Sequence, residues 1–154
     1  MLRNFKKNHQ SGFTIIEVLI VLAIAGLIMV AVFTAVPALQ RSSRNNQRKS
    51  AASQIMASIS SYVANHNGSL PGQADLNATA LNDYKPGFYQ NADVSYASYS
   101  ASPAAPAVEK AIFVSGAACS TDNTAIVAGA SSRSYVVWYA VETGGGSTTQ
   151  CIGS

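Results

Sequence analysis

Residues 13–39 read FTIIEVLIVLAIAGLIMVAVFTAVPAL, and this stretch decides how the rest of the chain is organised. From Val18 to Leu39 there are 22 residues without a charged side chain. As an α-helix they would be about 33 Å long, at about 1.5 Å per residue. Because the hydrocarbon core of a bilayer is about 30 Å thick, the run predicts a membrane-spanning helix. No second long apolar run follows it.

Charged residues flank this run on both sides. Arg3, Lys6 and Lys7 precede it, and a basic collar follows it: Arg41, Arg44, Arg48 and Lys49. From residue 50 onward, three basic and six acidic residues leave a balance of −3. Without its first twelve residues the chain has seven basic and seven acidic side chains. This neutrality suits close packing of many copies and argues against a general nucleic-acid binder.

The first twelve residues are short of apolar side chains and basic. An ordinary secretory signal is cut after its apolar region, whereas the candidate cut here, Gly12–Phe13, comes before it. Composition leaves two interpretations open, a cleaved leader and an uncleaved signal anchor. The orientation is open too, because three basic residues before the run and four after it give no clear positive-inside bias.

A specific motif surrounds the candidate cut: Gly12, Phe13, Thr14, Ile15, Ile16, Glu17. Followed by an apolar helix, it resembles the type IV pilin family, whose prepilins carry a class III signal peptide. The resemblance is specific over residues 12–30 and looser to residue 66. It implies that a prepilin peptidase cuts after Gly12 and N-methylates Phe13, and that Glu17 is the assembly carboxylate. It also implies a precursor in the inner, cytoplasmic membrane and an extracellular pilus on the cell surface.

Glu17 is an ionisable residue at the tip of an apolar helix, which makes it a functional candidate. In a membrane it could simply be solvated at the headgroup level. In a bundle of helices it needs a cation, and cleavage supplies the amine of Phe13. At about 4 Å and an effective dielectric of about 20, this pair attracts by roughly 4 kcal/mol before desolvation. The pair could form within one chain, four residues apart, or between subunits, which the resemblance favours.

The apolar half of the helix contains two weak points, Gly26 and Pro37. Glycine adds backbone freedom, and proline lacks an N–H and clashes with the carbonyl four residues earlier. In lipid the segment should stay helical, because unpaired backbone groups cost several kcal/mol each there. The resemblance implies that helix can be lost between Gly26 and Pro37 on filament assembly.

An amphipathic helix should follow the collar, because apolar residues recur with helical spacing: Ala52, Ile55, Met56, Ile59, Tyr62 and Val63. We expect this stripe to pack on a sheet, and the helix to end at residues 66–68 with Gly68 as left-handed cap. Residues 69–106 are rich in Ala, Ser, Asn, Tyr and Pro, and VSYASYSASPAAPA at 94–107 reads as loop.

Three β-rich runs come next, at residues 111–115, 125–128 and 134–142, and 148–152 could return as an edge strand. In the longest run, alternate residues share one face: Tyr135, Val137, Tyr139 and Val141. Cys119 and Cys151 flank it, and they would be disulfide-bonded outside the cell or free thiols in the cytosol. The resemblance implies the bond, which contributes about 3–4 kcal/mol in the chain-entropy model.

Taken together, the resemblance implies an α+β pilin fold, in which a long N-terminal α-helix packs on a small antiparallel β-sheet. Its parts would be a leader (1–12), a transmembrane and filament-core helix (13–40), an amphipathic half (41–68) and a globular head with an αβ-loop (69–154). We expect a structural subunit of a type IV pilus, most simply the major pilin, serving surface attachment or twitching motility. The alternative is a minor pilin or pseudopilin of a type II secretion or competence (DNA-uptake) system.

Patterns typical of enzymes are missing from the sequence: a phosphate loop, metal-ligand spacing and G-x-S-x-G. We therefore expect no catalytic residue, cofactor or metal. The implied partners are further copies of the chain, the prepilin peptidase, the assembly platform and its ATPases, and the membrane before assembly. We expect the collar to be solvated at the membrane surface, or to meet acidic residues of a neighbour, rather than to serve primarily as a DNA site.

Overall fold

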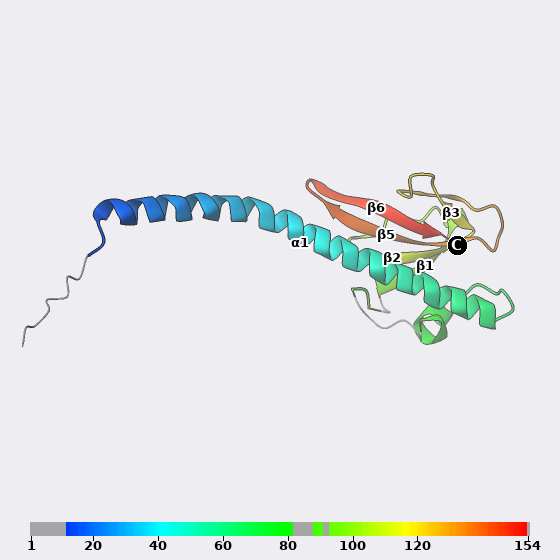
Figure 1. The fold of residues 1–154 in the computed structure, drawn as a ribbon. Helices are drawn as coiled ribbons and strands as arrows, with labels where there is room; N and C mark the ends of the chain where they lie inside the picture. Colours follow the sequence, from blue (N-terminus) through cyan, green and yellow to red (C-terminus); the bar gives the residue numbers. More distant parts are fainter. Residues whose placement is uncertain (1–11, 82–87, 91–92, 154) are drawn as a thin grey trace, which may run out of the picture. The chain divides into compact units, whose positions relative to one another are not determined.

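The computed structural model describes residues 12–81, 88–90 and 93–153. The chain divides into two compact units, Met1–Leu39 and Gln40–Ser154. Helix α1, Ile15–Asn65, begins in the first unit and ends in the second (Figure 1). The basic residues of the expected leader, Arg3, Lys6 and Lys7, lie outside the described residues.

The first unit contains the apolar half of α1. This segment is long and apolar enough to cross a membrane by length and composition, and none of its most apolar window is buried. Large side chains such as Leu27 and Phe33 are more than two-thirds exposed, at 74% and 71%. The helix runs without interruption through Gly26 and Pro37. Loss of helix between these two residues on assembly stays a prediction.

In the second unit the amphipathic half of α1 supplies one side of the core. The predicted apolar stripe is confirmed, because Ala52, Ile55 and Ile59 are fully buried and Met56 is nearly so. These residues pack with side chains from the sheet in a single hydrophobic cluster. The stripe forms a helix face because its members recur every three or four residues.

The helix ends close to the predicted position. The Gly68 N–H donates to the Val63 carbonyl at 2.9 Å, which is the bond of a Schellman motif. Both Asn67 (φ 53°) and Gly68 (φ 79°) are left-handed, so Asn67 occupies the capping position that the sequence assigned to Gly68. Asn tolerates this conformation better than most non-glycine residues.

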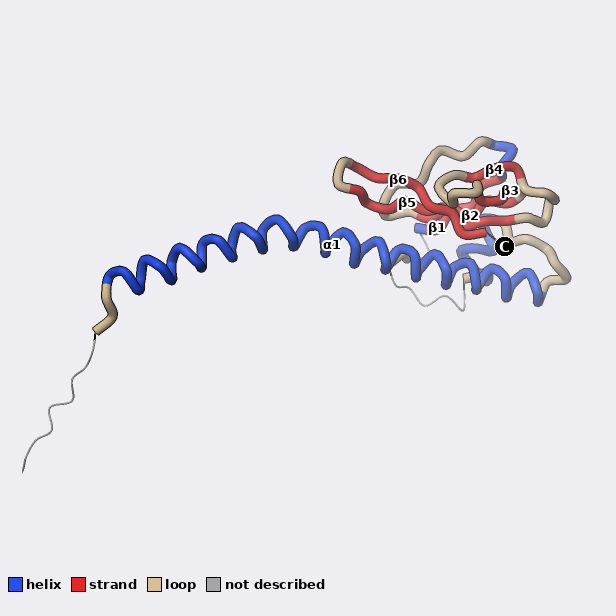
Figure 2. Tube along the Cα trace, turned by 45° about the horizontal axis from the view of Figure 1, so that its top comes forward, coloured by secondary structure: helices blue, strands red, loops and turns tan. Residues whose placement is uncertain are grey.

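The second unit holds a four-stranded sheet in the order β1-β2-β5-β6 (Figure 2). Its strands are β1 (Val94–Ser98), β2 (Ala111–Ser115), β5 (Tyr135–Thr143) and β6 (Gly146–Gly153). β1 pairs with β2 in parallel, and the other pairs are antiparallel. A separate hairpin joins β3 (Ala117–Cys119) to β4 (Ile126–Ala128). The expected α+β fold is confirmed, and the sheet is antiparallel as expected except for the parallel pair of β1 and β2.

Short helices connect the end of α1 to the sheet and follow its first strand. They are α2 (Gln73–Asp75), the π-helix η1 (Leu76–Ala80) and the 3₁₀ helix η3 (Tyr99–Ala101). Of these, η1 contributes to the core, because Leu76 is fully buried.

The prediction of loop for residues 94–107 is wrong at its start. Val94–Ser98 form β1, and η3 follows directly. Val94 is almost completely buried, and the backbone N–H of Tyr96 donates to the side-chain carbonyl of Gln73 at 2.7 Å. The partners of this strand lie in β2 and α2, so low-complexity composition could not reveal them. The short strand β3 was likewise not predicted.

Strand β5 is buried on both faces. The predicted face of Tyr135, Val137, Tyr139 and Val141 packs in the cluster shared with α1. The opposite face places Val136 and Trp138 in a second cluster with Val114, Ala117 and Cys151. β5 is therefore the central element of the second unit.

Candidate functional site

The predicted cleavage bond lies in an exposed, non-helical segment before α1. Phe13 is 89% exposed, and no atom lies within 4 Å of the position that a side chain on Gly12 would occupy. A peptidase needs an accessible backbone outside regular secondary structure, and both residues are exposed and non-helical. Processing at this bond and methylation of Phe13 stay predictions.

Glu17 forms a capping box at the start of α1. Its Oε2 accepts a hydrogen bond from the Thr14 N–H at 2.8 Å and another from the Thr14 hydroxyl at 2.7 Å. The Glu17 N–H donates to the Thr14 hydroxyl oxygen at 3.3 Å. This arrangement satisfies amide groups that a helix start leaves unpaired. This capping box was not predicted, although T-x-x-E before an apolar run is its usual signal.

The capping box leaves part of the Glu17 carboxylate available. Both bonds from Thr14 go to Oε2, and within the described residues Oε1 accepts none. An ionised carboxylate can accept about four hydrogen bonds. One carboxylate can thus cap its own helix and bind a further donor. The role of Glu17 in assembly stays a prediction.

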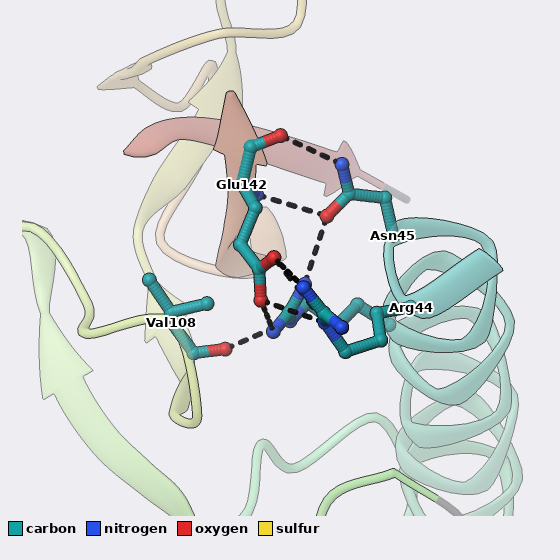
Figure 3. A network of polar contacts seen from close by, with 5 residues as sticks. Arg44, Asn45, Val108 and Glu142 are labelled. Atoms are coloured by element: carbon teal, nitrogen blue, oxygen red, sulfur yellow. Dashed lines mark hydrogen bonds and ion pairs between the residues drawn. The ribbon is translucent and has the colours of Figure 1, made fainter. Parts of the chain in front are cut away.

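The expectation of a solvated collar is wrong for Arg48 and only partly right for Arg44, whose side chain is 43% exposed but is paired within the chain. Arg48 is only 2% exposed, and its terminal nitrogen lies 2.6 Å from Oε1 of Glu142 in β5. Arg44 donates from Nε to the same carboxylate at 3.1 Å (Figure 3). The sequence could not show this pairing, because 98 residues separate Arg44 from Glu142.

Further bonds extend this contact into a polar clamp, defined as Arg44, Asn45, Arg48, Val108 and Glu142. The Asn45 side chain donates to the Glu142 carbonyl at 2.8 Å and accepts from the Glu142 N–H at 2.9 Å. Arg48 donates to the Val108 carbonyl at 3.0 Å and to Asn45 at 2.8 Å. Every nitrogen of the buried guanidinium therefore has an acceptor, as burial of a charge requires.

The clamp controls the ionisation of its carboxyl group. Hydrogen bonds from Arg44 and then Arg48 lower the pKa of Glu142 from 4.5 to about 2. The same contact raises the pKa of Arg44. The Arg48 guanidinium also lies over the Phe88 ring, 4.5 Å from its centre, in a cation–π contact. Two collar cations are thus committed to the chain's own head.

A disulfide joins Cys119 of β3 to Cys151 of β6, with their Cα atoms 5.6 Å apart. It ties the small hairpin to the edge of the main sheet. The Cys151 N–H also donates to the Asn123 carbonyl at 2.9 Å, so the connection between β3 and β4 covers part of this edge. The bond is the one that the resemblance implied.

Among the residues that the structure describes, no group of three or more His, Cys, Asp or Glu side chains could hold a metal ion. The features that the structure does present are the capping box at the start of α1, the exposed apolar half of α1 and the polar clamp. These are features for binding and packing.

Residues 7–33 match the family model of the prokaryotic N-terminal methylation motif. Comparisons with curated proteins and with solved structures gave no significant match. The chain thus carries the class III signal of type IV pilins, followed by a long apolar helix. The motif supports a place in the pilin and pseudopilin family, whose members are structural proteins. It implies processing by a prepilin peptidase and assembly into a pilus-like polymer.

Proposed function

We propose that this chain is the major subunit of a type IV pilus and polymerises through α1 once its leader is removed. The observation that carries the proposal is the uncovered apolar half of α1, directly behind a prepilin signal. Removing apolar surface from water is favourable by about 25 cal/mol per Å². Lipid covers it in the precursor, and the helices of other copies cover it in a filament.

Processing would complete an assembly contact, because it adds a cation to the carboxylate that Glu17 already provides. Cleavage between Gly12 and Phe13 creates an amine at the tip of α1, and methylation leaves this amine able to carry a charge. The capping box does not use the Oε1 atom of Glu17, so this atom can accept a hydrogen bond from the Phe13 amine of a neighbouring copy. A bundle that excludes water strengthens such a pair, and the pair would set the axial register of neighbouring helices.

The proposed partners follow from this cycle. The prepilin peptidase acts first, on the precursor in the inner membrane. An assembly platform and separate ATPases would then drive extension, since the sequence contains no phosphate loop with which the chain could bind a nucleotide. The finished pilus would serve surface attachment or twitching motility.

Mass spectrometry of filaments sheared from the cell surface tests the proposal. We expect this chain to be the main component, with an N-terminus at N-methyl-Phe13. An N-terminus at Met1 or beyond Leu39 would contradict the pilin assignment. A correctly processed chain at trace level would instead favour the alternative, a minor pilin or pseudopilin.

A further inference from the structure

One carboxylate of the described chain has no partner there. The other acidic side chains each accept a hydrogen bond within the chain: Glu17, Asp75, Asp93, Asp122 and Glu142. Glu109 is exposed, and within residues 12–81, 88–90 and 93–153 it has neither a hydrogen bond nor an ion pair. An exposed carboxylate of this kind is either simply solvated or available to another molecule.

The backbone on both sides of Glu109 is anchored. The carbonyl of Val108 accepts the bond from buried Arg48 at 3.0 Å. On the other side, the backbone N–H of Lys110 donates to the Ala107 carbonyl at 2.9 Å, and β2 begins at the next residue. Because its neighbours are held, Glu109 projects from a defined turn. A partner would bind it with little loss of backbone freedom.

Three described cations also lack an ion pair within the described chain: Arg41, Lys49 and Arg133. The first two belong to the collar and are here called the free collar cations. The other collar members, Arg44 and Arg48, are held by Glu142 in the clamp. Without acidic partners, the free collar cations of neighbouring copies would repel one another.

We propose that Glu109 of one copy forms an ion pair with the free collar cations of a neighbouring copy. The inference rests on the proposed function, because polymerisation through α1 brings copies side by side. The contact between Val108 and Arg48 places Glu109 beside the collar of its own chain. Copies packed at similar heights therefore bring it near the collar of the next copy. The occupant is a second copy, since the unpaired charges of one chain are opposite in sign and repeat in every subunit.

Charge reversal in the full chain, expressed in cells that assemble filaments, tests this contact. Glu109→Lys should lower the mass of surface filaments about fivefold, equivalent to about 1 kcal/mol per contact. Glu109→Gln should cause a smaller loss, because it removes attraction without adding repulsion. Adding Arg41→Glu or Lys49→Glu to Glu109→Lys should restore filaments toward the original level and identify the cation.

Arg133→Glu combined with Glu109→Lys is the matched control, since it makes the same change of charge away from the collar. Free-thiol labelling checks that Cys119 and Cys151 remain bonded in every variant. Unchanged filament mass in Glu109→Lys would overturn the inference, as would a loss that neither collar reversal restores or one that Arg133→Glu restores equally well. If the unsubstituted chain forms no filaments, it is the proposed function that fails.

Discussion

The two halves of α1 have opposite surroundings, although they belong to one continuous helix. The apolar half is exposed along its length, whereas the amphipathic half buries Ala52, Ile55 and Ile59 completely. Apolar content therefore does not decide burial in this chain, because the most apolar segment is the least covered. The sheet offers a complementary surface to the second half, and the first half must find its cover outside the chain.

Each half of α1 is in contact with one carboxylate, Glu17 in the apolar half and Glu142 of β5 beside the amphipathic half, and the two differ in the same way. Glu142 binds two arginines of the amphipathic half, so its charge is balanced within the chain. Glu17 caps its own helix through one oxygen and keeps the other available. The first contact stabilises the fold, and the second leaves one carboxylate oxygen able to accept a further hydrogen bond.

The largest effect is expected from Glu17→Val, which removes the charged side chain at the start of the uncovered half. Membrane insertion should persist or improve, because an apolar side chain is cheaper to place in lipid. Filaments should be lost or sharply reduced, as electron microscopy would show. Thr14→Ala removes the capping hydroxyl but keeps the carboxylate, and it should leave most filaments. Normal piliation in Glu17→Val would show that the carboxylate is not an assembly determinant.

Arg48→Ala tests how much the polar clamp stabilises the covered half of α1. It removes the buried cation of the clamp and leaves the Val108 carbonyl without its donor, whereas the Asn45 side-chain oxygen keeps its bond from the Glu142 N–H. The free energy of unfolding should fall by about 1–3 kcal/mol, since a buried acceptor loses its partner while Glu142 keeps Arg44; denaturant titration in detergent with Trp138 fluorescence measures this. The adjacent exposed cation is the control, and Lys49→Ala should change stability by no more than about 0.5 kcal/mol. Equal effects of the two substitutions would contradict the clamp.

Removing the disulfide tests whether the second unit needs covalent support as well as the clamp. Replacing both Cys119 and Cys151 by Ser should lower the free energy of unfolding by about 3–4 kcal/mol in the chain-entropy model. Thiol labelling of native filaments of the unsubstituted chain should find no free thiol. Quantitative labelling of both cysteines would refute the bond.

Acid should weaken the second unit selectively. The pKa of Glu142 falls from 4.5 to about 2 on folding, because Arg44 and Arg48 donate to its charged form. Its stabilisation is complete above pH about 4.5 and is lost as the pH falls toward about 2. Asp122 titrates over the same window, because Ser120 and Thr124 hold its pKa at about 2.

Thermal unfolding between pH 2 and pH 6 measures this loss. Glu142→Gln should reduce the acid dependence of the melting temperature, with Asp122 responsible for part of what remains. An unchanged slope in Glu142→Gln would show that the clamp carboxylate does not control acid stability.

The subtlest expected difference lies within the uncovered half, between Gly26 and Pro37. Eleven helical steps separate them and rise about 16 Å at about 1.5 Å each. A filament map with a clearly longer span would show that helix is lost on assembly. Continuous helix through Pro37 would show that packing between copies outweighs the local weakness.

Local features were predictable from the order of residues. Several elements depend on patterns that can be read along the sequence: the apolar run, the amphipathic stripe, the strand at 111–115 and the alternating faces of β5. The capping box of Thr14 and Glu17 is equally local, because the T-x-x-E spacing before an apolar run predicts it. The motif at the expected cut carried the family signal.

Tertiary structure alone decided the remaining features. Nothing near Arg48 in the sequence indicates that Glu142, 94 residues later, would draw it into the protein. Likewise, β1 exists because β2 and Gln73 pair its backbone, and its own composition suggested loop. Helices and apolar runs arise from neighbours along the chain, whereas ion pairs and strand pairings need partners that only folding brings together.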